Sequence, residues 1–568
     1  MALRSTWLLG LAMSCAAACY DDAPMTMTTL EHASAGTGDA TDTTDGGAAD
    51  DTTASDGGST SGGEPSCTVL DPLPDDAVPT TRGAVRGSTS GGVMAFLAVP
   101  YAAAPIDELR WQPPAPAPCW SDVLEATAPP PKCPQLESAT GPVVGDEDCL
   151  TLSIWTPSAT SDAQRPVMVF IHGGGHTTGS TDDPLYDGAR LSAVHDVVVV
   201  TIDYRLGALG WLALDALDAD DPRGVSGNYG LLDQLAALQW VHDNITAFGG
   251  DPGQVMLFGE SAGAVDTCAL VGTPDAEGLF GRAMVQSGTC EQRSATVYRS
   301  EVTDPWLAAS PCTDAADVAA CLRALPVDQV LTTEPTGYPT VSALSQAWSP
   351  YVDGVTLPAS TLDRLANGDA LDIPLVIGAN AEETARDTPM LDDAGFSALL
   401  LASFGPLAPQ VRDAYPLTDY ASPSAAWTAI TSDAKFICNA RRALRAAAQG
   451  HSAPVYRYHF SYDGYDVGPT GDASAFHGLE LVYVFGNFDA VAFGPLAYTP
   501  NTDDLALAQL LGEAWTSFAR TGDPSTATLA WPHYELADDP FAGLDVPAFV
   551  GAGVRTEQCD FWDGLVPG

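Results

Sequence analysis

The chain has 568 residues, and its 23 lysine and arginine residues stand against 73 aspartate and glutamate residues, a formal net charge of −50 at pH 7. Charge of this sign and size repels nucleic-acid phosphates and anionic lipid head groups, so neither is expected as a partner. The length could hold several average domains, but α/β enzymes with insertions often use it for one, and we expect a single catalytic domain.

The N-terminus has the features of an export signal. Arg4 precedes an apolar stretch from Trp7 to Ala18 that is too short to span a bilayer and has the composition of a secretory signal. We therefore expect residues 1–18 to be a signal peptide and the protein to be exported. The run Ala16-Ala17-Ala18-Cys19 resembles a bacterial lipobox, which makes Cys19 the candidate lipid-attachment site and Cys15 the lesser alternative. Ordinary cleavage at the same small residues would instead release a secreted protein.

A tether is predicted at residues 19–66. Residues 20–66 contain no lysine or arginine, include ten acidic residues and are rich in Asp, Thr, Gly, Ser and Ala. Low hydrophobicity combined with charge of one sign keeps a chain extended and disordered. The segment is expected to give reach between a membrane anchor and a folded domain at residues 67–568.

Apolar runs typical of strands alternate with helical patterns after Cys67. The predicted strands are Val167–Ile171, Val197–Tyr204, Val255–Phe258, Ala283–Gln286, Ile373–Gly378 and Val455–Phe460. Segments such as Leu231–Val241 between them repeat apolar residues at helical spacing. Continuous apolar strands interleaved with helices predict a mostly parallel sheet covered by helices, with catalytic residues beyond the strand ends.

A glycine-rich turn follows the predicted strand Val167–Ile171. It reads His172-Gly173-Gly174-Gly175, and its backbone N–H groups are not shielded by side chains. The turn resembles the oxyanion loop of esterases, in which such groups stabilise the negative oxygen of a tetrahedral intermediate. A flexible turn without such a role is the alternative, because glycine is abundant in this chain.

A serine flanked by glycines follows the predicted strand Val255–Phe258. The run Gly259-Glu260-Ser261-Ala262-Gly263 leads into a helical pattern at Ala264. In a G-x-S-x-G turn the glycines allow a strained connection that exposes the serine hydroxyl and directs the next helix N-terminus at the site. Ser261 is therefore a candidate nucleophile.

Several further motifs occur in an order that resembles one family. They are Leu109-Arg110-Trp111 with Pro113 and Pro114, Glu147-Asp148-Cys149-Leu150, Tyr204-Arg205-Leu206-Gly207, Gly227-Asn228-Tyr229-Gly230-Leu231-Leu232-Asp233-Gln234, Asn380-Ala381-Glu382-Glu383 and Phe476-His477-Gly478-Leu479-Glu480. Together with the serine turn they resemble the type B carboxylesterases, the cholinesterase-like branch of the α/β-hydrolases, over nearly all of the chain after Cys67. The resemblance implies the α/β-hydrolase fold, with a large, mostly parallel central sheet flanked by helices.

The resemblance also implies a catalytic triad. Ser261 matches the nucleophile, Glu383 the triad acid and His477 the general base, in the chain order of this fold. Glu383 lies just beyond the predicted strand that ends at Gly378, and Glu382 is the alternative acid.

The implied oxyanion donors are backbone N–H groups. They belong to Gly174, Gly175 and Ala262, the last being the residue after the nucleophile. His172 and His176, which flank the glycine loop, are expected to shape it.

The cysteines favour disulfides over a metal site. None of the twelve forms a C-x-x-C pair, and no histidine lies beside them at zinc-ligand spacing. Setting aside Cys15 and Cys19 leaves an even number, which suits an oxidising compartment. The resemblance implies the pairs Cys133–Cys149, Cys312–Cys321 and Cys438–Cys559, and elimination leaves Cys268–Cys290 and Cys67–Cys119. It also implies structural ion pairs between Arg110 and Glu147 and between Arg205 and Asp233.

The chain departs from the family pattern in three places. The loop from Cys133 to Cys149 lacks the tryptophan that choline-ester enzymes use to bind a quaternary ammonium, so choline esters are disfavoured. Thr384 stands where glycine is usual, and Asp203 stands where asparagine is usual.

These observations predict a serine carboxylic-ester hydrolase that acts through an acyl-enzyme on small to medium uncharged esters and needs neither metal nor organic cofactor. A catalytically silent binding protein of the same fold is the alternative from another class. A lipase acting on longer acyl chains is the closer alternative.

Overall fold

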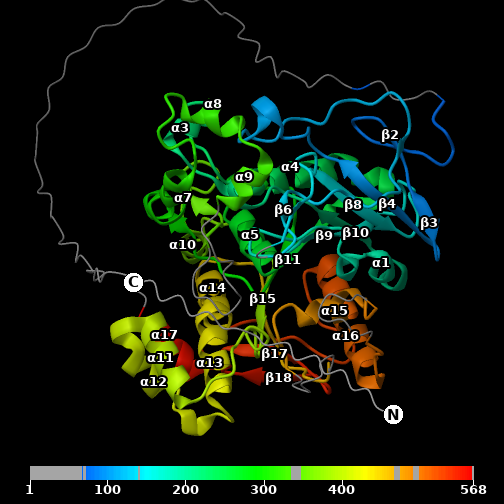
Figure 1. Ribbon diagram of the computed structural model, residues 1–568. Coiled ribbons are helices and arrows are strands. Elements are labelled where there is room, and N and C mark those ends of the chain that lie inside the picture. Colours follow the sequence, from blue (N-terminus) through cyan, green and yellow to red (C-terminus); the bar gives the residue numbers. More distant parts are fainter. Residues whose placement is uncertain are drawn as a thin grey trace, which may run out of the picture. The chain divides into compact units, whose positions relative to one another are not determined.

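The structure is a computed structural model, and it describes residue 67 and residues 72–138, 141–333, 347–465, 474–489 and 498–565 (Figure 1). All elements named below belong to one unit, Glu64–Gly568. The predicted signal peptide at 1–18, the lipid-attachment candidates Cys19 and Cys15, and the whole tether at 19–66 lie outside the described residues. These features remain predictions.

Within the described residues, eleven strands form the central sheet in the order β18-β17-β16-β15-β12-β11-β9-β10-β8-β4-β3. Their bounds are β3 (Ser88–Ser90), β4 (Val93–Pro100), β8 (Thr151–Thr156), β9 (Arg165–Ile171), β10 (Val198–Ile202), β11 (Gly250–Glu260), β12 (Arg282–Gln286), β15 (Leu375–Asn380), β16 (Val455–Phe460), β17 (Pro540–Leu544) and β18 (Phe549–Ala552). Neighbours from β10 to β17 pair in parallel, and antiparallel strands flank them on both sides. The predicted mostly parallel sheet is confirmed.

Helices cover both faces of the sheet because its central strands are apolar on both faces. In β9, Val167, Val169 and Ile171 pack into one core, and Met168 and Phe170 pack into the other. The first core includes α4 (Tyr229–Asn244), α5 (Ala262–Val271), α10 (Thr361–Asn367) and α14 (Cys438–Gly450). The second includes α1 (Ala189–His195), α15 (Leu479–Phe485) and α16 (Thr502–Thr521), and the last two lie side by side in Figure 1.

Shorter helices and small sheets lie outside this central sheet and its covering helices. The other α-helices of the described residues are α2 (Gly207–Trp211), α3 (Asp215–Asp218), α6 (Ala295–Tyr298), α7 (Asp304–Ala309), α8 (Val318–Arg323), α9 (Val327–Thr332), α11 (Asp393–Phe404), α12 (Ala408–Ala414), α13 (Pro423–Ser432) and α17 (Thr556–Asp563). Small sheets are formed by β1 (Val78–Pro79), β2 (Ala84–Arg86) and β5 (Leu124–Glu125), by β6 (Gln135–Leu136) with β7 (Val143–Val144), and by β13 (Arg293–Ser294) with β14 (Tyr351–Val352).

One helical stretch of the described chain, Asp393–Ala414, is long and apolar enough to cross a membrane by length and composition alone. It joins α11 and α12. Phe396, Leu400 and Val411 pack into a small core of their own, while Leu401 is exposed.

The predicted cross-links are present in the structure. The five cysteine pairs, with Cα–Cα distances in parentheses, are Cys67–Cys119 (5.6 Å), Cys133–Cys149 (5.1 Å), Cys268–Cys290 (5.4 Å), Cys312–Cys321 (5.7 Å) and Cys438–Cys559 (5.0 Å). The expected ion pairs also form: Arg110 Nε lies 2.7 Å from Glu147, and Arg205 Nη2 lies 2.7 Å from Asp233. The Cα–Cα distances of the five cysteine pairs suit a protein that folds in an oxidising environment.

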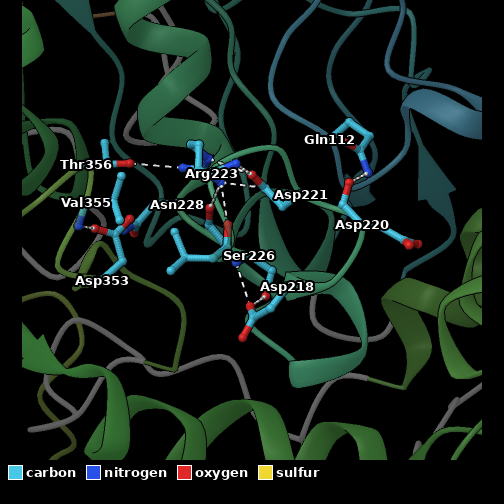
Figure 2. A network of polar contacts seen from close by, with 12 residues as sticks. Gln112, Asp218, Asp220, Asp221, Arg223, Ser226, Asn228, Asp353, Val355 and Thr356 are labelled. Carbon is cyan, nitrogen blue, oxygen red and sulfur yellow. Dashed lines mark hydrogen bonds and ion pairs between the residues drawn. The ribbon is translucent and has the colours of Figure 1, made fainter.

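A polar network holds the loop that leads into α4 (Figure 2). Arg223 donates to Asp221 at 2.7 Å and to the Thr356 hydroxyl at 2.9 Å. Asn228, which has a left-handed φ of 52° just before the helix, donates to Asp353 at 2.9 Å. These side-chain contacts tie the loop to the segment around Asp353 and Thr356 immediately before α4 begins.

The Arg205–Asp233 pair gives a stability prediction. Both side chains are almost fully buried, and two guanidinium nitrogens donate to the two carboxylate oxygens. Arg205→Met should lower the free energy of unfolding by about 3–5 kcal/mol, because it leaves a buried carboxylate without its cation. Denaturant unfolding measures the loss.

The matched control is Arg86→Met, because Arg86 pairs with Asp76 and Glu125 at an exposed site. The free energy of unfolding should change little in this variant, since exposed ion pairs contribute little to stability. Equal losses in the two variants would contradict a special role for the buried pair.

Candidate active site

Ser261 lies at a strained turn between β11 and α5, with φ 57° and ψ −120°. A Cβ on Gly259 would overlap the carbonyl of Gly263, and a Cβ on Gly263 would overlap the carbonyl of Ile171. Both flanking positions therefore require glycine. The Ser261 N–H donates to the Gln286 carbonyl at 2.9 Å, which ties the turn to the neighbouring strand β12.

The glycine loop lies directly beside this turn. In the parallel register of β9 and β11, Ile171 pairs with Gly259, so the two strands end together. A Cβ on Gly173 would lie 3.0 Å from Ser261 Cβ. Gly174 and Gly175 have φ of 106° and 63°, and these left-handed values are strained for residues with a side chain. The turn therefore brings unshielded backbone next to the serine.

Ala262 is the first residue of α5. The first N–H groups of a helix have no acceptor within the helix and carry the positive end of its dipole. The three N–H groups predicted to hold an oxyanion thus come from two backbone segments that meet at Ser261.

His176 anchors the glycine loop to α5, the helix that follows Ser261. Its Nε2 lies 2.8 Å from Asp266 of α5, and its Nδ1 lies 3.1 Å from the Trp348 carbonyl. Gln234 of α4 donates to the other Asp266 oxygen at 2.6 Å. All of these side chains are buried, so polar contacts in the protein interior hold the loop to α5 and α4.

His172, at the start of the glycine loop, is held in place by Tyr204. Its ring stacks on Tyr204 at 4.6 Å between centroids, and the Tyr204 hydroxyl donates to the His172 carbonyl at 2.9 Å. Burial lowers the pKa of His172 to about 4, so the ring is neutral. Asp203, the departure from asparagine, accepts hydrogen bonds from Thr181 N and Oγ1, and burial raises its pKa to about 7.

Glu383 and His477 are in direct contact. Glu383 Oε2 lies 2.6 Å from His477 Nδ1, and its Oε1 accepts a hydrogen bond from the Asn380 N–H at 2.7 Å. The His477 N–H donates to the Glu383 carbonyl at 3.0 Å, which joins the two turns through the backbone as well. Glu383 is 1% exposed, whereas its neighbour Glu382 is exposed. The geometry therefore favours Glu383 over the alternative acid.

Thr384, the other departure in this turn, is accommodated by hydrogen bonds. Its hydroxyl lies 2.6 Å from Thr431 Oγ1 and donates to the Thr428 carbonyl at 3.2 Å, both in α13. The hydroxyl adds a link between the acid turn and α13, and Glu383 keeps its contact with His477.

The structure adds two buried carboxylates that the sequence analysis did not assign. Glu260, immediately before Ser261, has Oε1 3.1 Å from His477 Nε2. Glu480 accepts hydrogen bonds from Asn380 at 2.6 Å and from Gln286 at 3.1 Å. Burial raises the pKa of Glu260 to about 8 and that of Glu480 to about 7. Both residues lie within the motifs matched above. Only the fold shows that they are buried close to the same His477 ring.

His477 is held as a strong base. Burial alone would lower its pKa, but the nearby Glu260 and Glu383 carboxylates outweigh that effect and raise it to about 9. Its Nε2 makes no hydrogen bond with suitable geometry to any described residue. That nitrogen is the one that a general base uses, and catalytic hydrogen bonds are often long before substrate binds.

A cavity opens at the serine. Its volume is about 330 Å³, within the range of small-molecule sites, and Ser261 and Phe436 are among its lining residues. The Phe436 ring also lies 4.7 Å from the His477 ring, centroid to centroid. The serine, the histidine and the cavity therefore form one site. Among the described residues, no cluster of histidine, cysteine or acidic side chains could hold a metal ion.

These features define a class of protein. A mostly parallel sheet with a strained serine turn after a central strand, and an acid and a histidine in turns after later strands, is an α/β-hydrolase. The chain belongs to the carboxylesterase family, whose sequence profile matches residues 74–562.

Relatives agree with this membership. A para-nitrobenzyl esterase from Bacillus subtilis is 37% identical over 488 residues, which cover 80% of this chain and 92% of the relative. A fumonisin B1 esterase from Sphingopyxis macrogoltabida is 36% identical over 492 residues, covering 84% of this chain and 88% of the relative. A solved para-nitrobenzyl esterase structure superposes with a TM-score of 0.74 at 32% identity, over 87% of this chain and all of that one. The protein is a carboxylesterase.

The packing of Gly263 against Ile171 gives a prediction for the turn. Gly263→Ala should lower the free energy of unfolding by about 1–3 kcal/mol and reduce ester hydrolysis, because the added methyl displaces the serine turn from the glycine loop. Thermal unfolding and hydrolysis of 4-nitrophenyl acetate measure the two effects.

Gly281→Ala is the matched control, since a Cβ there meets nothing within 4 Å. It should leave both measurements close to wild type. Wild-type activity in Gly263→Ala would contradict the constraint.

Proposed function

We propose that the protein hydrolyses small to medium carboxylic esters through an acyl-enzyme, with Ser261 as nucleophile, His477 as general base and Glu383 as the acid that orients it. One observation carries the proposal: His477 lies between the acid and the serine turn. Its Nδ1 is 2.6 Å from Oε2 of the buried Glu383, and its Nε2 is 3.1 Å from Oε1 of Glu260, the residue before Ser261. The cavity beside Ser261 supplies room for the ester.

The chemistry begins with proton transfer. His477 Nε2 takes the proton of Ser261 Oγ as that oxygen attacks the ester carbonyl, and the carbonyl π electrons move onto oxygen. The tetrahedral intermediate collapses, the bond to the alcohol oxygen breaks, and Nε2 returns the proton to the leaving alcohol. Water then enters, gives its proton to Nε2 and attacks the acyl group, and the acid is released as Ser261 regains its proton.

The oxyanion is stabilised by the backbone N–H groups of Gly174, Gly175 and Ala262. Because the loop is anchored through His176 and Asp266, these dipoles are oriented before substrate arrives. Preorganised donors of this kind lower the barrier without reorganising during the reaction.

Glu383 stabilises the imidazolium that forms during each half-reaction. Its Oε2 accepts from Nδ1, which selects the tautomer with Nε2 available as base. Glu260 adds a second carboxylate on the opposite side of the ring.

The cavity volume of about 330 Å³ suits small to medium esters. The para-nitrobenzyl and fumonisin B1 esterase names of two relatives support an ester as substrate. The absence of tryptophan between Cys133 and Cys149 disfavours choline esters.

Export is part of the proposal. Five cysteine pairs at disulfide distance favour an oxidising compartment, in keeping with the predicted signal peptide. A lipid on Cys19 would anchor the enzyme to the cell envelope, whereas simple cleavage would release it.

Active-site labelling tests the nucleophile. A fluorophosphonate probe should label the wild type and Ser397→Ala, whose serine lies on α11, but not Ser261→Ala. In Ser261→Ala, kcat for 4-nitrophenyl acetate should fall by about 10⁴-fold or more. A wild type that neither reacts with the probe nor turns over esters would favour the silent binding protein.

The pH profile tests the histidine environment. Activity needs neutral His477 and is lost as the pH falls through its pKa. Glu260→Gln removes a negative charge that raises this pKa, so the acid limb of the kcat/KM profile should move to lower pH.

Glu382→Gln is the control, because this exposed neighbour of Glu383 makes no contact with His477 among the described interactions. Its acid limb should stay in place. If the acid limb of Glu260→Gln stays in place or moves to higher pH, a group other than the Glu260–His477 pair controls activity.

A further inference from the structure

One buried asparagine contacts both of the turns that carry the proposed acid and base. Asn380 is the last residue of β15, and it is fully buried. Its backbone N–H donates to Glu383 Oε1 at 2.7 Å. Its side-chain Nδ2 donates to the Phe476 carbonyl at 2.8 Å and to Glu480 Oε2 at 2.6 Å. A single residue therefore contacts the acid turn, the residue before His477 and a further buried carboxylate.

The hydrogen-bond partners fix the orientation of the Asn380 amide. The Phe476 carbonyl can only accept, and the Glu480 carboxylate also accepts, so the amide turns its NH2 group toward them. Its Oδ1 then has no partner among the described residues. A buried acceptor without a donor costs free energy, and a leucine of similar volume would avoid that cost. The two hydrogen bonds that Nδ2 donates are therefore the reason for an asparagine at this position.

Glu480 extends this link to the serine turn. Its other oxygen, Oε1, accepts a hydrogen bond from Gln286 Nε2 at 3.1 Å. The carbonyl of the same glutamine accepts a hydrogen bond from the Ser261 N–H at 2.9 Å. The contacts that run from Asn380 through Glu480 and Gln286 thus join the acid and histidine turns to the serine turn, although the three turns come from distant parts of the chain.

The Asn380 amide also favours the ionised form of Glu480. Burial and the nearby Glu383 charge raise the pKa of Glu480, and the hydrogen bond from Asn380 opposes that rise, so that the pKa is about 7. The Glu480 carboxylate in turn raises the pKa of His477, together with the larger effects of Glu260 and Glu383. Without the Asn380 donor, Glu480 would bind a proton more readily and would favour the imidazolium less.

Other titratable and charged groups surround these side chains. They are Glu260 of β11, Tyr458 of β16, Tyr186 of η2 (Pro184–Tyr186), Lys435 of η8 (Asp433–Ile437) and Arg386 beside the Phe476 ring. Burial raises the pKa of the two tyrosines well above its usual value, so their hydroxyls stay neutral. The variants below leave all five groups unchanged, so a displaced pH profile reports on Asn380 and Glu480.

We propose that Asn380 is a positioning residue of the esterase reaction: its amide holds the His477 turn and the Glu480 carboxylate in one arrangement, so that the general base meets the nucleophile at a fixed place and beside a negative charge. This inference rests on the proposed function and deepens it. Asn380 is not among the residues that line the described cavity at Ser261, so it acts through its neighbours and does not bind the ester. Its effect should therefore fall on the chemical steps.

Asn380→Leu tests the proposal, because it keeps the volume of the side chain and removes both donated hydrogen bonds. The kcat for 4-nitrophenyl acetate should fall by about tenfold or more with little change in KM, since a displaced general base loses its alignment with the nucleophile. The acid limb of the kcat/KM profile should also move to lower pH, by about half a pH unit or more, because His477 loses part of the negative charge that raises its pKa. Asn380→Ala removes the same donors with less bulk and should move the limb in the same direction.

Asn244→Leu is the matched control, because Asn244 is another buried asparagine whose amide is hydrogen-bonded. At the end of α4, its Nδ2 donates to the Trp240 carbonyl at 2.8 Å, and its Oδ1 accepts from the Thr81 N–H at 2.7 Å. Asn244→Leu should lower the free energy of unfolding, as Asn380→Leu does, but it should leave the acid limb in place.

A double variant tests the route through Glu480. Glu480→Gln removes the charge and keeps the shape of the side chain, so its acid limb should also move to lower pH. Adding Asn380→Leu to Glu480→Gln should move the limb little further, because both changes act on the same charge. A full additional shift in the double variant would contradict the coupling of Asn380 to Glu480 and overturn the proposal.

The remaining outcomes are distinct. If Asn380→Leu loses stability and activity while its acid limb stays in place, the asparagine only supports the fold and the proposal is overturned. A raised KM with unchanged kcat would overturn it as well, because Asn380 would then act on substrate binding. In both cases, fluorophosphonate labelling of Ser261 would still support the proposed function. Undiminished hydrolysis by Ser261→Ala would instead overturn the proposed function.

Discussion

The parallel pairing of β9 with β11 is the constraint on which the site depends. Its register sets Ile171 beside Gly259, so the glycine loop and the serine turn leave the sheet at the same level. Gly263 then packs so closely against the Ile171 carbonyl that a side chain has no room. A slip of one residue would turn every side chain of the strand to the opposite face and separate the serine from the loop amides. Such a slip is opposed by the two apolar cores on either side of β9.

The second constraint is electrostatic. Glu260, Glu383 and Glu480 are buried around the single imidazole of His477. Several carboxylates in one apolar site cannot all ionise without a compensating cation, so burial raises the pKa of Glu260 and Glu480. The same negative charge favours the imidazolium, which is the species that forms when Ser261 attacks in the proposed mechanism.

Much of the framework could be predicted from local sequence. The run Val455–Phe460 is β16 itself, and Val255–Phe258 lies within β11, because continuous apolar residues bounded by turns are typical of strands buried on both faces. The outer strands of the sheet, among them β4 and β18, were not predicted. In β4 two half-buried residues separate successive buried ones, and the pairing with β8 is interrupted between Phe96 and Val99, so the strand shows no simple alternation. In β18 most side chains are exposed, and its pairing with β17 is what makes it a strand.

For the site, sequence by itself determined the residues that local geometry demands: a serine between obligatory glycines, a glycine loop after a strand, and an acid and a histidine in recognisable turns. The tertiary structure decided which of two adjacent glutamates reaches His477, since Glu383 is buried against it and Glu382 is exposed. It also decided that Glu260 lies beside His477. Proximity across hundreds of residues is set by strand register and helix packing, and neither leaves a trace in the residues next to a side chain.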